Sequence, residues 1–113
     1  MEKNSSLELI FSNNILLVQK QILKDFNPFD IHFPENFDKE IYAFEEILML
    51  IENNLSQIME NQQKTLQLLY KIDISENLFF EIIQKPDLLT NLAHQILHRE
   101  AQKVYYRLKF YKK

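Results

Sequence analysis

The chain of 113 residues contains no glycine, no cysteine and no tryptophan. Average usage would place about eight glycines in a chain of this length. Phosphate-cradling loops, the dinucleotide-binding fingerprint and the EF-hand turn all need glycine, because their backbone adopts a positive φ or approaches the ligand closely. Cysteine is needed for disulfides, for thiolate zinc sites and for thiol nucleophiles. These absences exclude most of the short motifs from which an activity is recognised.

Long apolar runs are also absent. No stretch approaches the roughly 20 apolar residues that span a bilayer, and the first residues lack the pattern of a signal peptide. Hydrophobic residues make up 46% of the chain and charged residues 26%, which is typical of a globular protein. We therefore expect a single domain over residues 1–113, without a membrane span, and by elimination a cytoplasmic location.

Apolar residues recur at spacings of three and four along most of the chain, which is the periodicity of an α-helix. The pattern predicts an all-α fold, a small bundle of about four helices. Ser5 and Glu8 have the spacing of a capping box, and Asp73 and Glu76 repeat it farther on. The turns rely on proline, asparagine and aspartate, all compatible with a negative φ, and ten asparagines are available where a left-handed cap is needed. The expected helices cover residues 6–26, 35–72, 75–85 and 86–109.

The second expected helix carries a heptad seam over residues 37–58. Its members are Phe37, Ile41, Phe44, Leu48, Ile51, Leu55 and Ile58. No proline interrupts residues 35–72, so we expect one continuous helix, with a bend near Asn53 or Asn61 as the alternative. A heptad seam is typical of helices that pair. The first helix is apolar on two sides, which suits either the centre of a bundle or a shared subunit interface.

Residues 26–37 connect these two helices and combine two prolines with four phenylalanines. The prolines exclude a continuous helix, and the aromatic rings exclude a solvated linker. Burial of each ring is worth roughly 1.5–3 kcal/mol, enough to hold a loop against the core. We expect this connection to close one end of the core, and an aromatic docking segment is the alternative.

Charge is divided unevenly along the chain. Residues 1–98 hold seven Lys/Arg against fifteen Asp/Glu, a balance of −8, whereas residues 99–113 hold six Lys/Arg against one Glu, a balance of +5. The end of the chain, residues 105–113, interleaves four aromatic with four basic residues. The candidate interaction residues there are Tyr105, Tyr106, Arg107, Lys109, Phe110, Tyr111, Lys112 and Lys113.

Several interpretations fit this basic-aromatic end. Cations suit phosphates and rings suit stacked bases, which is the combination that single-stranded nucleic acid requires. Positive charge at a helix C-terminus is also favoured by the helix dipole, and the same residues suit contact with the acidic segment 35–60 or with a partner. Anionic lipid headgroups are a further alternative. The balance of −8 elsewhere argues against general coating of DNA.

Glu100 falls within the apolar arc of the last helix, where a carboxylate needs a partner. Lys103 and Arg107 follow on the same helix. We expect Glu100, Lys103 and Arg107 to form a buried structural ion pair that fixes the helix register. The alternative is a proton-transfer group with a raised pKa, which requires a pocket.

His94 and His98 lie four residues apart, so both imidazoles share one helix face. A metal site would need a third ligand from Glu45, Glu46 or His32, and the helical wheel favours ordinary boundary residues instead. We assign no catalytic residue, cofactor site or metal site.

The sequence therefore indicates a non-enzymatic helical-bundle interaction protein. We expect it to self-associate as a dimer or to bind another protein, because of the heptad seam and the two-sided first helix. The alternative is a nucleic-acid-binding accessory protein that uses residues 105–113.

Overall fold

Five α-helices make up most of residues 13–111, which are the residues that the structure, a computed structural model, describes. In chain order they are α2 (Ile15–Phe26), α3 (Phe44–Ile58), α4 (Gln62–Ile72), α5 (Glu76–Ile83) and α6 (Leu88–Tyr111). The predicted all-α fold is confirmed, with five helices in this part of the chain rather than about four. The capping box expected at Ser5 and Glu8 lies outside the described residues.

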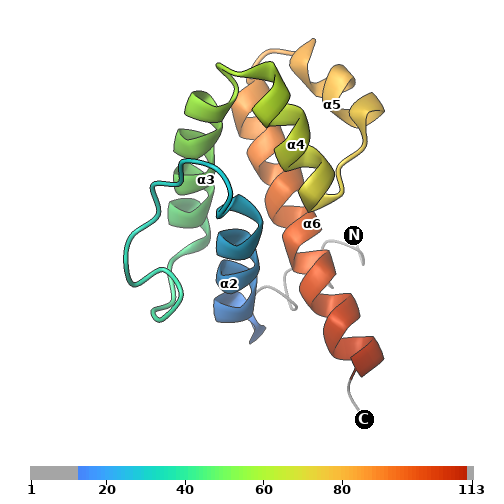
Figure 1. Cartoon of the computed structure of the whole chain (residues 1–113). Helices are drawn as coiled ribbons and strands as arrows, with labels where there is room; N and C mark the ends of the chain where they lie inside the picture. The colour runs from blue at the N-terminus through green and yellow to red at the C-terminus, as the bar shows by residue number, and fades with distance from the viewer. Residues whose placement is uncertain (1–12, 112–113) are drawn as a thin grey trace.

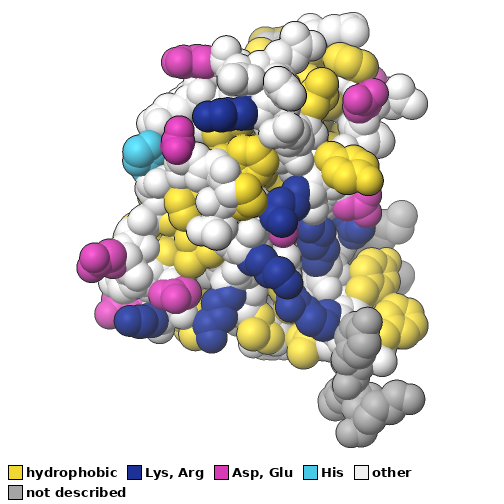
Figure 2. Space-filling model, in the orientation of Figure 1, with side chains coloured by type: hydrophobic (Ala, Val, Ile, Leu, Met, Phe, Trp, Pro, Cys, Tyr) yellow, Lys and Arg dark blue, Asp and Glu magenta, His cyan; other side chains and the backbone are white. Residues whose placement is uncertain are grey.

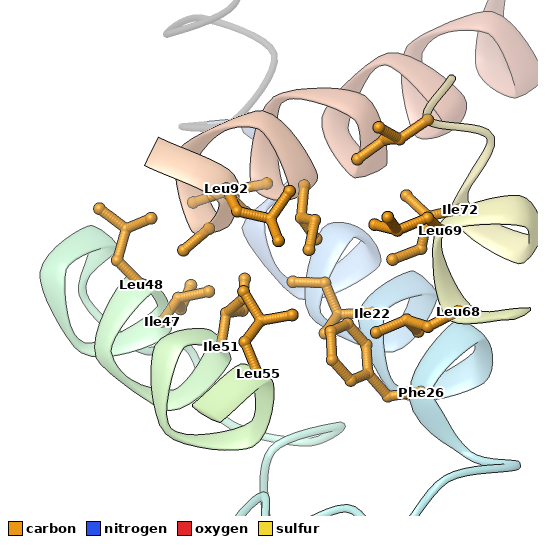
Figure 3. Close-up of a cluster of buried hydrophobic side chains, with 14 of the residues drawn as sticks. Ile22, Phe26, Ile47, Leu48, Ile51, Leu55, Leu68, Leu69, Ile72 and Leu92 are labelled. Atoms are coloured by element: carbon orange, nitrogen blue, oxygen red, sulfur yellow. The ribbon is translucent and has the colours of Figure 1, made fainter. Parts of the chain in front are cut away.

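Helix α6 forms the long axis of the bundle and contacts each of the other four helices (Figure 1). Its 24 residues span about 36 Å at 1.5 Å per residue. Helix α5 lies beside its first turns, and α2 runs antiparallel along its C-terminal half. Side chains of α2, α3, α4 and α6 meet in one apolar core (Figure 3), and the fully buried ones include Ile22, Phe26, Ile51, Leu55, Leu68, Ile72 and Leu92.

The single continuous helix predicted over residues 35–72 is wrong, because the chain turns between α3 and α4. Asn61 Oδ1 accepts the N–H of Lys64 at 3.1 Å and so caps α4. Thr65 Oγ1 lies 3.2 Å from the carbonyl oxygen of Ile58 and 2.9 Å from that of Asn61. Side chains thus satisfy the backbone groups of this turn, and neither glycine nor proline is needed. The break falls at the alternative position near Asn61.

Residues 34–43 are not helical either, although the prediction placed them mostly in the same helix. The buried side chain of Gln19, on α2, holds them through three hydrogen bonds. Its Nε2 donates to the carbonyls of Phe37 at 2.6 Å and Glu40 at 2.8 Å, and its Oε1 accepts the N–H of Tyr42 at 2.9 Å. Gln19 therefore satisfies backbone N–H and C=O groups of residues 37–42 that would otherwise bond to one another within a helix.

The members of the heptad seam lie in different environments. Ile51 and Leu55 are fully buried in the core, whereas Ile41 is 68% exposed and Phe44 39% exposed. A spacing of three and four identifies one helix face but not what covers it. Here the buried part of that face packs within one chain, against α6 and α4.

The aromatic rings of the connection between α2 and α3 pack on one another. The ring centroids of Phe26 and Phe33 lie 5.5 Å apart in a T-shaped pair, and those of Phe33 and Phe37 lie 4.8 Å apart and stacked. Buried Asn54, on α3, accepts the N–H of His32 at 2.8 Å and so ties the connection to the bundle. The rings therefore lie against the core.

Two aspartates adopt the left-handed conformation that glycine usually supplies. Asp73 ends α4 with φ 78° and Asp87 precedes α6 with φ 59°. The N-cap of α5 is Ser75, whose hydroxyl accepts the N–H of Leu78 at 3.1 Å, so the predicted N-cap at Asp73 is wrong. Aspartate tolerates the left-handed region better than most residues. The expectation of a negative φ in these two turns is therefore wrong, and aspartate rather than asparagine takes the left-handed positions.

Candidate functional site

The C-terminal end of α6 extends beyond the core. Val104 is 1% exposed and is the last buried residue among the side chains described on this helix, which continues to Tyr111. The large apolar side chains after it are exposed: Tyr105 36%, Tyr106 46%, Leu108 40% and Phe110 63%. Of the eight predicted interaction residues, Tyr105, Tyr106, Arg107, Lys109 and Phe110 lie on this exposed end, and Tyr111 is the last residue of the helix. Lys112 and Lys113 lie outside the described residues.

The exposed rings on this end of α6 are arranged around a cation. The centroids of Tyr105 and Tyr106 lie 5.4 Å apart, and those of Tyr106 and Phe110 lie 6.2 Å apart with 22° between the ring planes. Lys109 Nζ lies 5.7 Å from the centroid of Tyr105 and 5.9 Å from that of Phe110. Such cation–π contacts hold the ammonium group among the rings while it remains accessible.

The basic residues nearer the core point toward α2 instead. Lys103 Nζ lies 2.7 Å from Oδ2 of Asp25, and Arg107 Nη2 donates to Oε1 of Gln21 at 2.6 Å. Gln21 in turn donates to Oδ1 of Asp25 at 3.2 Å. One polar network therefore fastens α6 to α2.

Glu100 lies within this network and is fully buried. Its Oε1 lies 3.9 Å from Lys103 Nζ, whereas Arg107, the other predicted partner, bonds to Gln21. The ion pairs of α6 thus reach Asp25 and Asp73 rather than the acids of segment 35–60. The sequence did not identify Asp25, since periodicity does not show which side chains two helices turn toward each other.

The surroundings of Glu100 favour its protonated form. Neither of its oxygens accepts a hydrogen bond from the described residues. Burial, a hydrogen bond to Asp25 and the negative charge of Asp25 raise the pKa of Glu100 well above 4.5, and the charges of Lys103 and Arg99 offset this only in part. A proton on Glu100 would supply a donor between the Glu100 and Asp25 carboxyl groups, which otherwise repel each other. Asp25, Lys103 and neutral Glu100 then carry no net charge.

Three exposed lysines, here called the basic face, lie on the helices that this network joins to α6. Lys20 and Lys24 are exposed on α2, and Lys71 is exposed on α4. Lys103 Nζ also donates to the carbonyl of Lys71 at 2.9 Å, which brings α4 beside α6. Figure 2 shows Lys and Arg side chains gathered over α2 and α6. The sequence did not identify these three lysines as site residues; the only signal was the four-residue spacing of Lys20 and Lys24.

The two histidines that share one face of α6 have separate surroundings. The ring of His94 lies 6.0 Å from that of Phe44, and His98 Nε2 lies 3.1 Å from Nε2 of Gln102. Partial burial and the charge of Arg99 lower the pKa of His98 below 6.5. Residues 13–111 hold no group of three His, Asp or Glu side chains placed to bind a metal ion.

A hollow of about 410 Å³ lies where α3 turns into α4. Its lining is mostly polar and exposed, and it includes the ion pair between Lys64 Nζ and Asp30 Oδ2, 3.6 Å apart. The lining brings no nucleophile and base together, so it suggests no reaction.

Within the described part of the chain, none of the helices combines the length and the apolar character that crossing a bilayer requires. Compared with known proteins, the chain matches no family, no curated protein and no solved structure.

Proposed function

We propose that this protein is a non-enzymatic accessory protein that binds nucleic acid through the C-terminal end of α6. The observation that carries the proposal is the exposed cluster of Tyr105, Tyr106, Lys109 and Phe110 beyond the last buried residue. Exposed rings offer stacking surfaces for bases, and the interleaved cations attract phosphates. A helix anchored in the core presents these groups in a fixed arrangement, so little order has to be gained on binding.

Binding to a labelled single-stranded oligonucleotide tests the proposal. We expect the wild-type protein to bind at low salt and the double variant Tyr106→Ser/Phe110→Ser to bind at least tenfold more weakly, because stacking contributes about 1–3 kcal/mol per base. Fluorescence anisotropy titrations measure both affinities.

Phe80→Ser is the matched control, because Phe80 lies on α5 and is exposed to nearly the same degree as Tyr106, 43% against 46%. We expect it to leave the affinity unchanged. Absence of wild-type binding at low salt contradicts the proposed function, and an equal loss in Phe80→Ser contradicts the assignment to α6.

Self-association, the first expectation from the sequence, is the second candidate function. The heptad seam no longer supports it, since Ile51 and Leu55 lie in the core of a single chain. The exposed Tyr106, Leu108 and Phe110 favour it instead, because a second copy would bury them.

This candidate predicts that the mass measured by light scattering rises from 13.7 kDa toward twice that value as protein concentration increases. Phe110→Ser is then expected to keep the protein monomeric. A constant mass of 13.7 kDa at every concentration contradicts self-association.

A further inference from the structure

We propose that the ligand is single-stranded nucleic acid and that its backbone continues from the end of α6 across α2 and α4, with Lys20, Lys24 and Lys71 contacting phosphates. This inference rests on the function proposed above and extends the site to two helices that the sequence did not connect with it.

The polar network brings together the helices that carry the three lysines, because Lys103 Nζ lies 2.7 Å from Asp25 Oδ2 on α2 and 2.9 Å from the carbonyl of Lys71 on α4. Lys24 directly precedes Asp25, which pairs with Lys103 at 2.7 Å, and Lys20 directly precedes Gln21, which bonds to Arg107 at 2.6 Å. The carbonyl of Lys71 itself accepts the Lys103 ammonium at 2.9 Å. Neighbouring residues of a helix point about 100° apart, so the side chains of Lys20 and Lys24 lie on the exposed side of α2 and not on the side that faces α6. The exposed sides of α2 and α4 therefore adjoin α6, and Figure 2 shows Lys and Arg side chains gathered over α2 and α6.

The charges of this face are largely uncompensated. Lys20, Lys24 and Lys71 make no ion pair within residues 13–111, and Arg107 is held by the neutral amide of Gln21. Of the acids beneath it, Asp25 already pairs with Lys103 at 2.7 Å, and burial raises the pKa of Glu100 and so favours its uncharged form. Although the chain has a formal net charge of −3, this surface therefore carries a local positive charge, which is what attracts a polyanion.

Exposed rings favour a single strand over a duplex. The bases of a duplex are already stacked on one another, whereas those of a single strand are free to stack on protein rings. Tyr106 and Phe110 offer such rings at one end of the surface. Tyr70, 88% exposed and next to Lys71, offers another on α4. Phosphate contacts alone would bind single strands and duplexes alike.

The test compares two triple variants that change the net charge equally. The first is Lys20→Gln/Lys24→Gln/Lys71→Gln. The control is Lys39→Gln/Lys64→Gln/Lys85→Gln, which removes three exposed lysines outside the proposed surface. Circular dichroism and urea unfolding check that both variants are folded.

Anisotropy titrations with one labelled single-stranded oligonucleotide over a range of salt concentrations give the affinity and its salt dependence. For the first variant we expect at least a tenfold loss of affinity at low salt. We also expect the negative slope of log K against log salt to become shallower by about 2, because each phosphate contact on a single strand contributes about −0.7 to that slope. The control is expected to keep the wild-type slope. An unlabelled single strand is expected to compete better than a duplex of the same sequence.

Equal losses in the two triple variants overturn this inference, and so does a duplex that competes as well as the single strand. The proposed function fails separately, if the wild-type protein binds no nucleic acid at low salt. Binding that is lost in Tyr106→Ser/Phe110→Ser but retained in the first triple variant sustains that function and overturns only the extension to α2 and α4.

Discussion

Replacement of Lys103 by methionine is expected to lower the free energy of unfolding by about 3 kcal/mol. The Lys103 ammonium lies 2.7 Å from Oδ2 of Asp25, whose side chain is 5% exposed. Without it, the Asp25 carboxylate keeps only the Gln21 amide, at 3.2 Å, and the protonated Glu100. Removing one partner of a buried ion pair typically costs about 3–5 kcal/mol. The lower end applies because 20% of the Lys103 side chain remains exposed to water.

Urea unfolding followed by circular dichroism measures this change. Lys109→Met is the matched control on the same helix, because Lys109 contacts the rings of Tyr105 and Phe110. We expect it to change the stability by less than about 0.5 kcal/mol. The double variant Asp25→Asn/Lys103→Met is expected to recover part of the loss, since neither charge then remains buried. A Lys103→Met protein as stable as the wild type would show that water, not Lys103, compensates the charge of Asp25.

The elements that could be predicted from the sequence are those with local signals. The proline before α6 and the helical spacing of apolar residues both act within a few positions, whereas the N-cap of α5 was placed at Asp73 instead of Ser75. The path between α2 and α3 could not be predicted in this way. It depends on Gln19, which bonds to backbone groups 18, 21 and 23 positions away. Periodicity carries no information about such contacts, and the run from Phe37 to Phe44 therefore resembled the start of a helix.

The candidate site likewise has a part that the sequence predicted and a part that it did not. Composition alone pointed to the exposed end of α6, because its aromatic and basic residues are consecutive in the chain. The spacing of apolar residues likewise placed Glu100 on the buried arc of the helix. Its neighbour Asp25 and the exposed Lys71 come from other helices, and only the packing of α2, α4 and α6 brings them together. This packing therefore buries Asp25 and Glu100 at the contact between α2 and α6 and leaves Lys71 exposed beside it.

The protonation of Glu100 leads to the second large expected effect, on the pH dependence of stability. Asp25 from α2 and Lys103 and Arg99 from α6 act on this carboxyl, and its pKa is well above 4.5 in the folded chain. At pH values between the pKa of Glu100 in the unfolded chain, 4.5, and its higher pKa in the folded chain, the folded protein binds one proton more than the unfolded one. The resulting stabilisation is complete below pH 4.5 and is lost as pH rises through the folded pKa. In that window Glu100 lowers the free energy of unfolding by about 1.4 kcal/mol per pH unit.

Glu100→Gln is expected to remove this slope, since the amide has the shape of the protonated carboxyl and still donates to Asp25 but does not titrate. Urea unfolding at a series of pH values from 5 to 8 measures the free energy of unfolding of the variant and of the wild type. As pH rises, the variant should become increasingly more stable than the wild type. Above the pKa of Glu100 in the folded chain, the difference between the two should become constant. Glu81→Gln, an exposed carboxyl on α5, should keep the wild-type slope. Parallel pH profiles for Glu100→Gln and the wild type would mean that Glu100 is ionised in the folded protein. In that case the Asp25–Lys103–Glu100 cluster would carry a net negative charge, and the basic face above it would be weaker by one unit.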